Sequence, residues 1–173
     1  MAGQVRRAGG RFLAFFALWL AGMALVFEVG RAAFVHGYML PVATCTVSVL
    51  RLLGVEAMLG QLQIAAGMCH LAVGTVVYRV TFECTGIFAL FMCLAAVLAF
   101  PARGRERLRG VLIVLPAFFC YSVARMVILG LVAGIAPAHI ELFHLYVMVL
   151  VNVGFVVALW LYWLDGVAVE VRP

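Results

Sequence analysis

The feature that most constrains this chain is a set of four long apolar runs with almost no charge inside them. About 20 helical residues cross the hydrocarbon core of a bilayer, and each run approaches that length with its flanking residues. With 68% hydrophobic and 11% charged residues, a soluble domain of this size could not bury so much apolar surface. We therefore predict one all-α polytopic membrane domain over residues 1–173, with about four transmembrane helices. The runs are Phe12–Phe27 with its extension toward Phe34, Cys84–Phe100, Val111–Val132 and His139–Leu164.

The positive charge of the chain comes from arginines that flank the apolar runs, so we expect membrane lipids and not nucleic acid as the partner. Short arginine-rich loops stay in the cytoplasm, which predicts that both the N-terminus and the loop after the second run are cytoplasmic. The first run, within an anchor segment over residues 1–35, is followed by Glu28 and Arg31 and lacks a small-residue cleavage site, so we expect an uncleaved anchor. The flanking arginines are Arg6, Arg7 and Arg11 before the first run, and Arg103, Arg105, Arg107 and Arg109 after the second.

Residues 36–83 do not fit a simple span. Tyr38–Leu53 is short and interrupted by polar residues, so we expect an interfacial or re-entrant helix there, which also leaves both termini on the cytoplasmic side. From Gly54 to Glu83 the glycines recur about every seven residues. The segment 74–82 is rich in β-branched and aromatic residues, which predicts a small extracytoplasmic cap resembling a β-hairpin.

The five cysteines show no CxxC spacing and their number is odd, so no disulfide framework, metal site or cofactor is predicted. Cys69 and His70 are adjacent in the predicted cap, but a metal would need more ligands than this pair, and we expect an ordinary loop pair. Cys45, Cys93 and Cys120 lie in apolar runs, where a free cysteine behaves as a small core hydrophobe.

Three polar residues of the segment 84–164 are expected at one depth, near the outer face of the membrane. Cys84 begins the second run at its outer end. Arg125 lies 14 residues after Val111, about 21 Å along a helix. His144 lies about one turn into the last run, whereas His139 precedes it at the boundary and, five residues away, faces another direction.

This set of residues fits thiol acyl transfer. Cys84 would be the nucleophile, with a thiol pKa lowered by a cation or a helix N-terminus. His144 would act as base and then as acid, and Arg125 would hold the charge that develops on a carbonyl oxygen. The main alternative is a non-enzymatic membrane assembly or transporter subunit, in which Arg125 pairs with Glu83 or Glu141 and His144 is a second polar contact between helices. A proton or ion pathway would require more intramembrane carboxylates than the runs contain.

The chain resembles the exosortase/archaeosortase family of membrane transpeptidases, and most of all the H-type exosortases. The resemblance extends over about residues 74–164 and rests on the order and spacing of several short motifs. Ser122 stands where the family usually has an asparagine, three residues before the arginine. The motifs are Glu83-Cys-Thr-Gly86, Ala99-Phe-Pro-Ala102, Arg125-Met-Val and Phe143-His-Leu-Tyr146.

The resemblance implies a cysteine protease and transpeptidase of a prokaryotic cytoplasmic membrane, with its active site facing outward. Its substrates would be exported proteins whose C-terminal tail carries a recognition motif, a transmembrane helix and basic residues. Cys84 would cleave at the motif, hold the substrate as a thioester and transfer it to an amine acceptor. Cys84, Arg125 and His144 match the family's catalytic residues, and Ser122 and Glu83 would support them.

Overall fold

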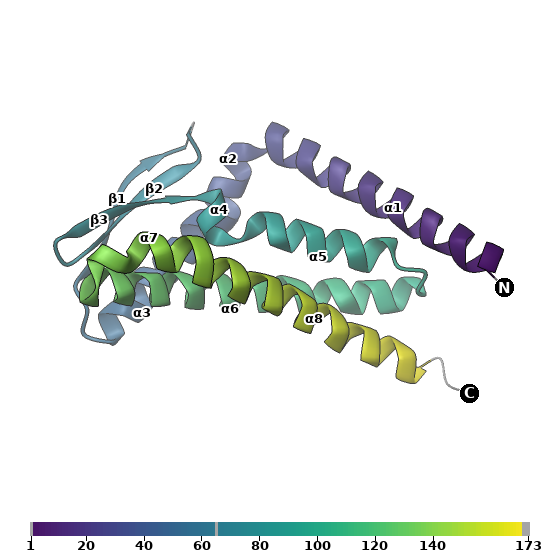
Figure 1. Ribbon diagram of the computed structural model, residues 1–173. Helices are drawn as coiled ribbons and strands as arrows, with labels where there is room; N and C mark the ends of the chain where they lie inside the picture. The colour runs from purple at the N-terminus through teal and green to yellow at the C-terminus, as the bar shows by residue number, and fades with distance from the viewer. Residues whose placement is uncertain (1, 65, 171–173) are drawn as a thin grey trace.

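The computed structural model describes residues 2–64 and 66–170 and is mainly helical, with one small sheet (Figure 1). Short helical turns, two of them π-helical, connect α1 to α3 and α6 to α8. The helices are α1 (Ala2–Val29), α2 (Arg31–Phe34), α3 (Leu40–Leu52), α4 (Phe82–Thr85), α5 (Ile87–Ala99), α6 (Gly104–Ile135), α7 (Ile140–Leu142) and α8 (Met148–Glu170), with π-helical turns η1 (Val35–Met39) and η3 (Phe143–Val147) and a 3-10 turn η2 (Pro137–His139). The strands are β1 (Ala57–Gln63), β2 (Met68–Val73) and β3 (Val76–Thr81).

Helix α5 lies at the centre of the bundle, where it contacts α1, α6 and α8. Helix α6 also contacts α3 and α8. Figure 1 shows α1, α5, α6 and α8 running along a common direction, with the sheet at one end. We call this the sheet end. The first turns of α1, the last turns of α8 and the connection from α5 to α6 lie at the opposite end (Figure 1). We call it the arginine end, because Arg103, Arg105, Arg107 and Arg109 lie in this connection and at the start of α6.

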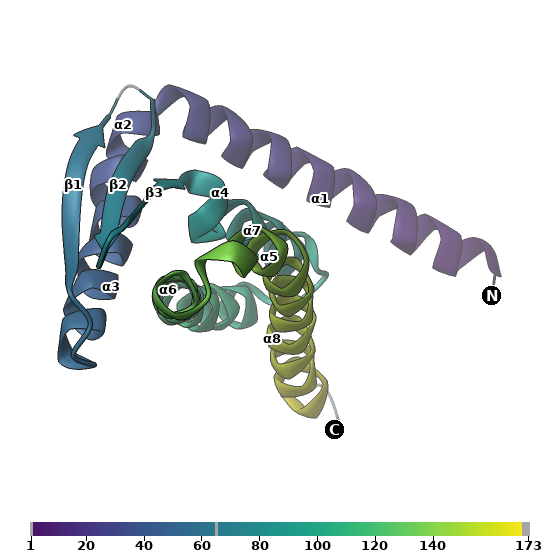
Figure 2. The same cartoon turned by 60° about the vertical axis from the view of Figure 1, so that its left-hand side comes forward.

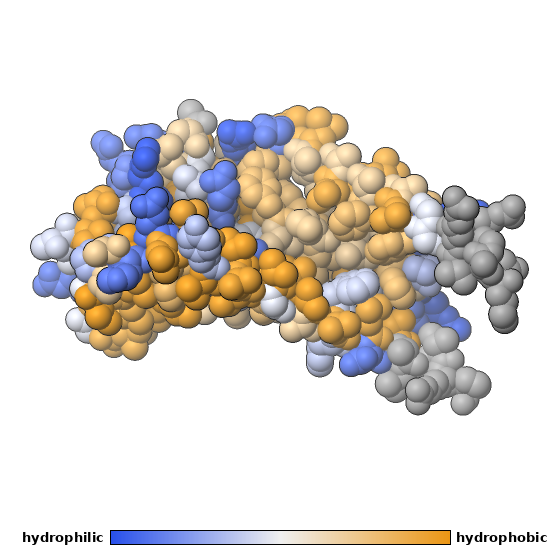
Figure 3. Space-filling model, viewed as in Figure 1, coloured by the Kyte–Doolittle hydropathy of each residue, from blue (hydrophilic) through white to orange (hydrophobic). Residues whose placement is uncertain are grey.

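The membrane character of the chain is confirmed by length and composition. Within residues 2–64 and 66–170, four helical stretches are long and apolar enough to cross a bilayer, and Ile87–Ala99 is a shorter apolar helix of 13 residues. Figure 3 shows hydrophobic side chains gathered over the helices, whereas many hydrophilic ones gather at the sheet end. The four stretches are Gly9–Val29, Arg31–Leu52, Gly104–Ile135 and Pro137–Val167.

One of these stretches was expected to be too short to span. The helix containing residues 38–53 begins at Arg31 and continues through the π-helical turn η1, so the continuous apolar stretch has 22 residues. Gly30 separates it from α1, which ends at Val29 and not near residue 35. Figures 1 and 2 show that α2 and α3 cross the direction of α1 at the sheet end, so the stretch combines the length of a span with an oblique orientation.

The expected hairpin-like cap is a three-stranded antiparallel sheet in the order β1-β2-β3. Glycines allow both turns, because Gly67 and Gly74 adopt positive φ angles of 61° and 56°, a conformation that strains other residues. The pairing of β1 with β2 shifts register between Leu59 and Leu62. The expectation of a loop at Cys69 is wrong, since Cys69 lies on the central strand with its side chain fully buried.

Two further helix boundaries differ from the sequence prediction. The expected loop at 103–109 is helical from Gly104, because the Glu106 carboxylate accepts a hydrogen bond of 2.7 Å from the backbone N–H of Arg103 at the start of α6. The last helix does not end at Leu164 but continues to Glu170. The arginines at 105, 107 and 109 therefore lie on the first two turns of α6.

An aromatic cluster fixes α1 to the rest of the bundle near the sheet end. The Phe27 ring, only 4% exposed, lies 4.8 Å from the Phe82 ring and 5.4 Å from the Phe88 ring, measured between centroids. The Phe34 and Phe91 rings lie 5.3 and 5.9 Å from it. Most of these pairs are edge-on, the arrangement that aromatic quadrupoles favour.

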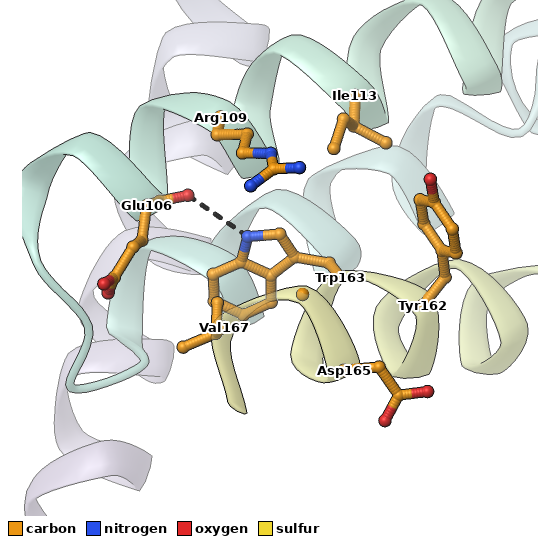
Figure 4. A pocket seen from close by; sticks show the side chains of 8 residues that line it. Glu106, Arg109, Ile113, Tyr162, Trp163, Asp165 and Val167 are labelled. Carbon is orange, nitrogen blue, oxygen red and sulfur yellow. Dashed lines mark hydrogen bonds between the residues drawn. The ribbon is translucent and has the colours of Figure 1, made fainter. Parts of the chain in front are cut away.

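At the arginine end, α6 and α8 approach closely at Gly110. The indole N–H of Trp163 donates a hydrogen bond to the Glu106 carbonyl at 3.1 Å, beside a cavity of about 540 Å³ that Arg109 and Asp165 also line (Figure 4). A Cβ atom at Gly110 would lie 2.6 Å from both Trp163 Nε1 and Val97 Cγ1. Only glycine fits between these two side chains.

We expect Gly110→Ala to destabilise the protein by about 1–3 kcal/mol, the usual range for overpacking a core. Thermal unfolding in detergent would measure the loss. Gly134→Ala on the same helix is the matched control, because a Cβ there meets nothing within 4 Å. Equal stability of the two variants would contradict the close contact at Gly110.

Candidate functional site

Cys84 lies on a single helical turn between the sheet and the bundle. Thr81 precedes this turn in an extended conformation, and Gly86 ends it with a φ of 73°. The prediction that Cys84 begins the long second helix is therefore wrong, because the left-handed conformation of Gly86 interrupts the helix and α5 begins at Ile87. Cys84 lies between the strand end and this break, outside the long apolar stretches.

His144 reaches Cys84 from the other side of the site. Its Nε2 lies 3.9 Å from Cys84 Sγ, within hydrogen-bonding distance for sulfur. His144 lies in the π-helical turn η3, and π-helical turns frequently occur at functional sites. Its Nδ1 is buried and has no hydrogen-bond partner among the described residues. His139, in the 3-10 turn η2, is exposed.

The surroundings of Cys84 favour its thiolate. Burial alone would raise the pKa of the Cys84 thiol, but hydrogen bonds from His144 and Thr81, and the charge of His144, lower it below its usual value. The Thr81 hydroxyl lies 3.5 Å from the sulfur. The turn that carries Cys84 is only four residues long, so the expected long helix does not begin at this residue.

Arg125 lies on α6 and is 7% exposed. Its Nε is buried without a hydrogen-bond partner among the described residues. Its Nη1 lies 3.6 Å from the point that a Cβ on Gly86 would occupy, two residues from the candidate nucleophile. Across the described residues the single ion pair joins Arg31 to Glu28, so Arg125 pairs with neither Glu83 nor Glu141.

Ser122, on α6, connects this helix to the turns α4 and η1 next to Cys84. Its fully buried hydroxyl lies 2.6 Å from the Thr85 carbonyl, 2.7 Å from the Phe118 carbonyl and 2.8 Å from the Tyr38 hydroxyl. A hydroxyl has one proton to donate, so Ser122 donates to a carbonyl and accepts from Tyr38. Ser122 therefore holds the turn carrying Cys84 against α6.

Glu83 has no direct hydrogen bond to Cys84 among the described residues. Its side chain is exposed and accepts a hydrogen bond of 3.1 Å from the Thr81 hydroxyl. Since that hydroxyl also contacts Cys84 Sγ, Glu83 reaches the sulfur only through Thr81.

Sequence reasoning missed three residues near this site. Tyr78 on β3 has a buried hydroxyl without a hydrogen-bond partner in the described part of the chain, and burial together with the nearby Cys84 raises its pKa. Burial and Cys84 likewise raise the pKa of the Cys69 thiol to about 11. The Oδ1 atom of Asn152, on α8, lies 3.7 Å from the position that a Cβ on Gly86 would occupy, the same position that Arg125 Nη1 approaches. A signal for Asn152 existed, since it is the one asparagine of the chain and stands in a long apolar run.

The described residues contain no group of three or more His, Cys, Asp or Glu side chains that could hold a metal ion. Comparison of the chain with protein-family models, with curated proteins and with solved structures gives no match. The functional argument therefore rests on the geometry around Cys84.

We expect the alkylation of Cys84 by iodoacetamide to reach half its maximal rate at a lower pH than the alkylation of an ordinary thiol, because a lowered pKa leaves more thiolate near neutrality. Removing the imidazole in His144→Ala should move this midpoint to higher pH and slow alkylation at pH 7. Mass spectrometry of each cysteine in the detergent-solubilised protein would follow the reaction.

His139→Ala is the control for this pH profile, because His139 is exposed and belongs to the neighbouring turn. It should leave the midpoint unchanged. An identical Cys84 profile in wild type and His144→Ala would show that the imidazole does not act on this thiol.

Proposed function

We propose that this protein is a membrane-embedded cysteine protease and transpeptidase. The observation that carries the proposal is the contact between Cys84 Sγ and His144 Nε2 at 3.9 Å, beside a buried arginine that has no carboxylate partner among the described residues. A thiol with a lowered pKa, an imidazole within reach and a cation at the same place are the parts that acyl transfer through a thioester requires.

In the proposed reaction the Cys84 thiol loses its proton to His144 Nε2, and its sulfur attacks the carbonyl carbon of a peptide bond. The C–N bond then breaks, and the imidazolium returns the proton to the departing amine. The substrate remains bound to Cys84 as a thioester. An amine acceptor attacks this thioester, His144 takes the proton of the amine, and the leaving sulfur recovers it as a thiol.

Arg125 stabilises the tetrahedral intermediate in this scheme. Its guanidinium lies beside Gly86, and its Nε, which has no hydrogen-bond partner among the described residues, is a donor that a substrate oxygen could accept from. Charge that develops on the carbonyl oxygen is stabilised best by donors fixed in place before the reaction. In the non-enzymatic alternative, Arg125 would bond to neighbouring helices, a role that Ser122 fulfils here.

The substrates proposed are exported proteins with a C-terminal tail of recognition motif, transmembrane helix and basic residues. The position of Cys84 between the sheet and the bundle, away from the arginine end, supports cleavage outside the cytoplasm of a prokaryotic cell. A substrate helix would lie in the bilayer beside the bundle, with its motif at the level of Cys84.

We expect Cys84→Ala to abolish processing of a tail-bearing substrate while the protein still accumulates in the membrane, because the loss concerns the nucleophile. Co-expression with a tagged substrate and gel analysis would measure cleavage, and a hydroxylamine-sensitive adduct on wild-type Cys84 would identify the thioester. The control is Cys120→Ala, since Cys120 is exposed on α6. Processing by Cys84→Ala, or its loss in Cys120→Ala, would refute the assignment of the nucleophile.

We expect Arg125→Lys to lower turnover by at least about a hundredfold, the effect of removing one oxyanion donor. Arginine offers a planar fork of donors and stays charged when buried, whereas a buried lysine readily loses its proton. Arg79→Lys on the exposed face of β3 should keep wild-type turnover. Near-normal turnover of Arg125→Lys would mean that only bulk positive charge is needed.

A further inference from the structure

Asn152 is a half-buried polar residue for which the proposed reaction has so far no use. It lies on α8, about two helical turns after His144, in a run that is otherwise apolar. Its Oδ1 is buried and has no hydrogen-bond partner in the described part of the chain. Leaving such an acceptor without a partner in a membrane protein is unfavourable, so a ligand for it is to be expected.

The Asn152 amide and the Arg125 guanidinium meet at Gly86. A Cβ added to Gly86 would lie 3.6 Å from Arg125 Nη1 and 3.7 Å from Asn152 Oδ1. Because Gly86 has no side chain, the position that its Cβ would occupy lies within contact distance of both a donor, Arg125 Nη1, and an acceptor, Asn152 Oδ1. Arg125, more than nine-tenths buried, also keeps its Nε without a partner.

A peptide group is the ligand that matches this pair. Its carbonyl oxygen accepts from the guanidinium, while its N–H donates to the amide oxygen of Asn152. A carboxylate or phosphate would suit Arg125 but would meet the acceptor Oδ1 with a second acceptor. The space lies within two residues of Cys84, so a chain bound there has a peptide bond near the thiol.

We propose that Asn152 is a substrate-binding residue that, together with Arg125, holds one backbone peptide group of the substrate next to the bond cleaved at Cys84. This inference rests on the proposed function, since it assigns the peptide-binding part of the same site. One consequence concerns specificity: the substrate residue whose N–H binds Asn152 is not proline, because proline has no N–H to donate.

The test uses two small peptide reagents that alkylate Cys84. Iodoacetyl-glycinamide has an N–H next to its carbonyl, and iodoacetyl-sarcosinamide carries a methyl group in place of that hydrogen. In wild type we expect the first reagent to be favoured at Cys84 by about fivefold, the factor that one neutral hydrogen bond contributes. The ratio of the two rates at exposed Cys120 corrects for the intrinsic reactivity of the reagents.

In Asn152→Leu the corrected ratio at Cys84 should fall to about one, because leucine has a similar size and no acceptor. Asn152→Ala should show the same loss, which guards against misfolding of a single variant. Tyr162→Leu, an exposed position on the same helix, should keep the wild-type ratio. A wild-type ratio of one, or a preference that persists in both Asn152 variants, would overturn the role of Asn152.

This readout separates the inference from the proposed function, because alkylation needs no turnover. If Cys84 prefers iodoacetyl-glycinamide but the protein never processes a tail-bearing substrate, the peptide-binding site is supported and the protease function is refuted. If the protein processes the substrate but the corrected rate ratio at Cys84 is the same with and without Asn152, the protease function is supported and the role of Asn152 in peptide binding is refuted.

Discussion

The left-handed conformation of Gly86 is the constraint on which the rest of the site depends. With a φ of 73° it ends the turn that carries Cys84 and separates this turn from α5. The break leaves Cys84 beside the strand end, where Thr81 contacts its sulfur, and the missing side chain leaves space between Arg125 and Asn152. Any other residue would be strained in this backbone conformation and would also occupy that space.

Two π-helical turns bring the distant segments to this point. The turn Val35–Met39 contains Tyr38, whose hydroxyl bonds to Ser122, and the turn Phe143–Val147 contains His144. In a regular α-helix the extra residue would be absent and the side chains beyond it would rotate by about 100°. The hydrogen bond between the hydroxyls of Tyr38 and Ser122 thus fixes the scaffold, whereas Arg125 Nε and His144 Nδ1 have no hydrogen-bond partner among the described residues.

Much of this arrangement could be predicted from the sequence because polar residues are conspicuous in apolar helices. Cys84 and His144 were expected to meet on grounds of depth alone, and the structure brings them within 3.9 Å. The third strand, the break at Gly86 and the contact of Asn152 could not be predicted in this way. They depend on backbone conformation and on which helix faces pack together, and neither property follows from periodicity along one segment.

The contact between Cys84 and His144 joins residues that are 60 positions apart, and this order has a consequence for biosynthesis. The cysteine is synthesised and inserted well before the last helix that provides its imidazole. Until α8 packs against α5 and α6, the thiol lacks the hydrogen bond with His144, one of the contacts that lower its pKa. The packing of the last helix is therefore also the step that brings the imidazole of His144 to the Cys84 thiol.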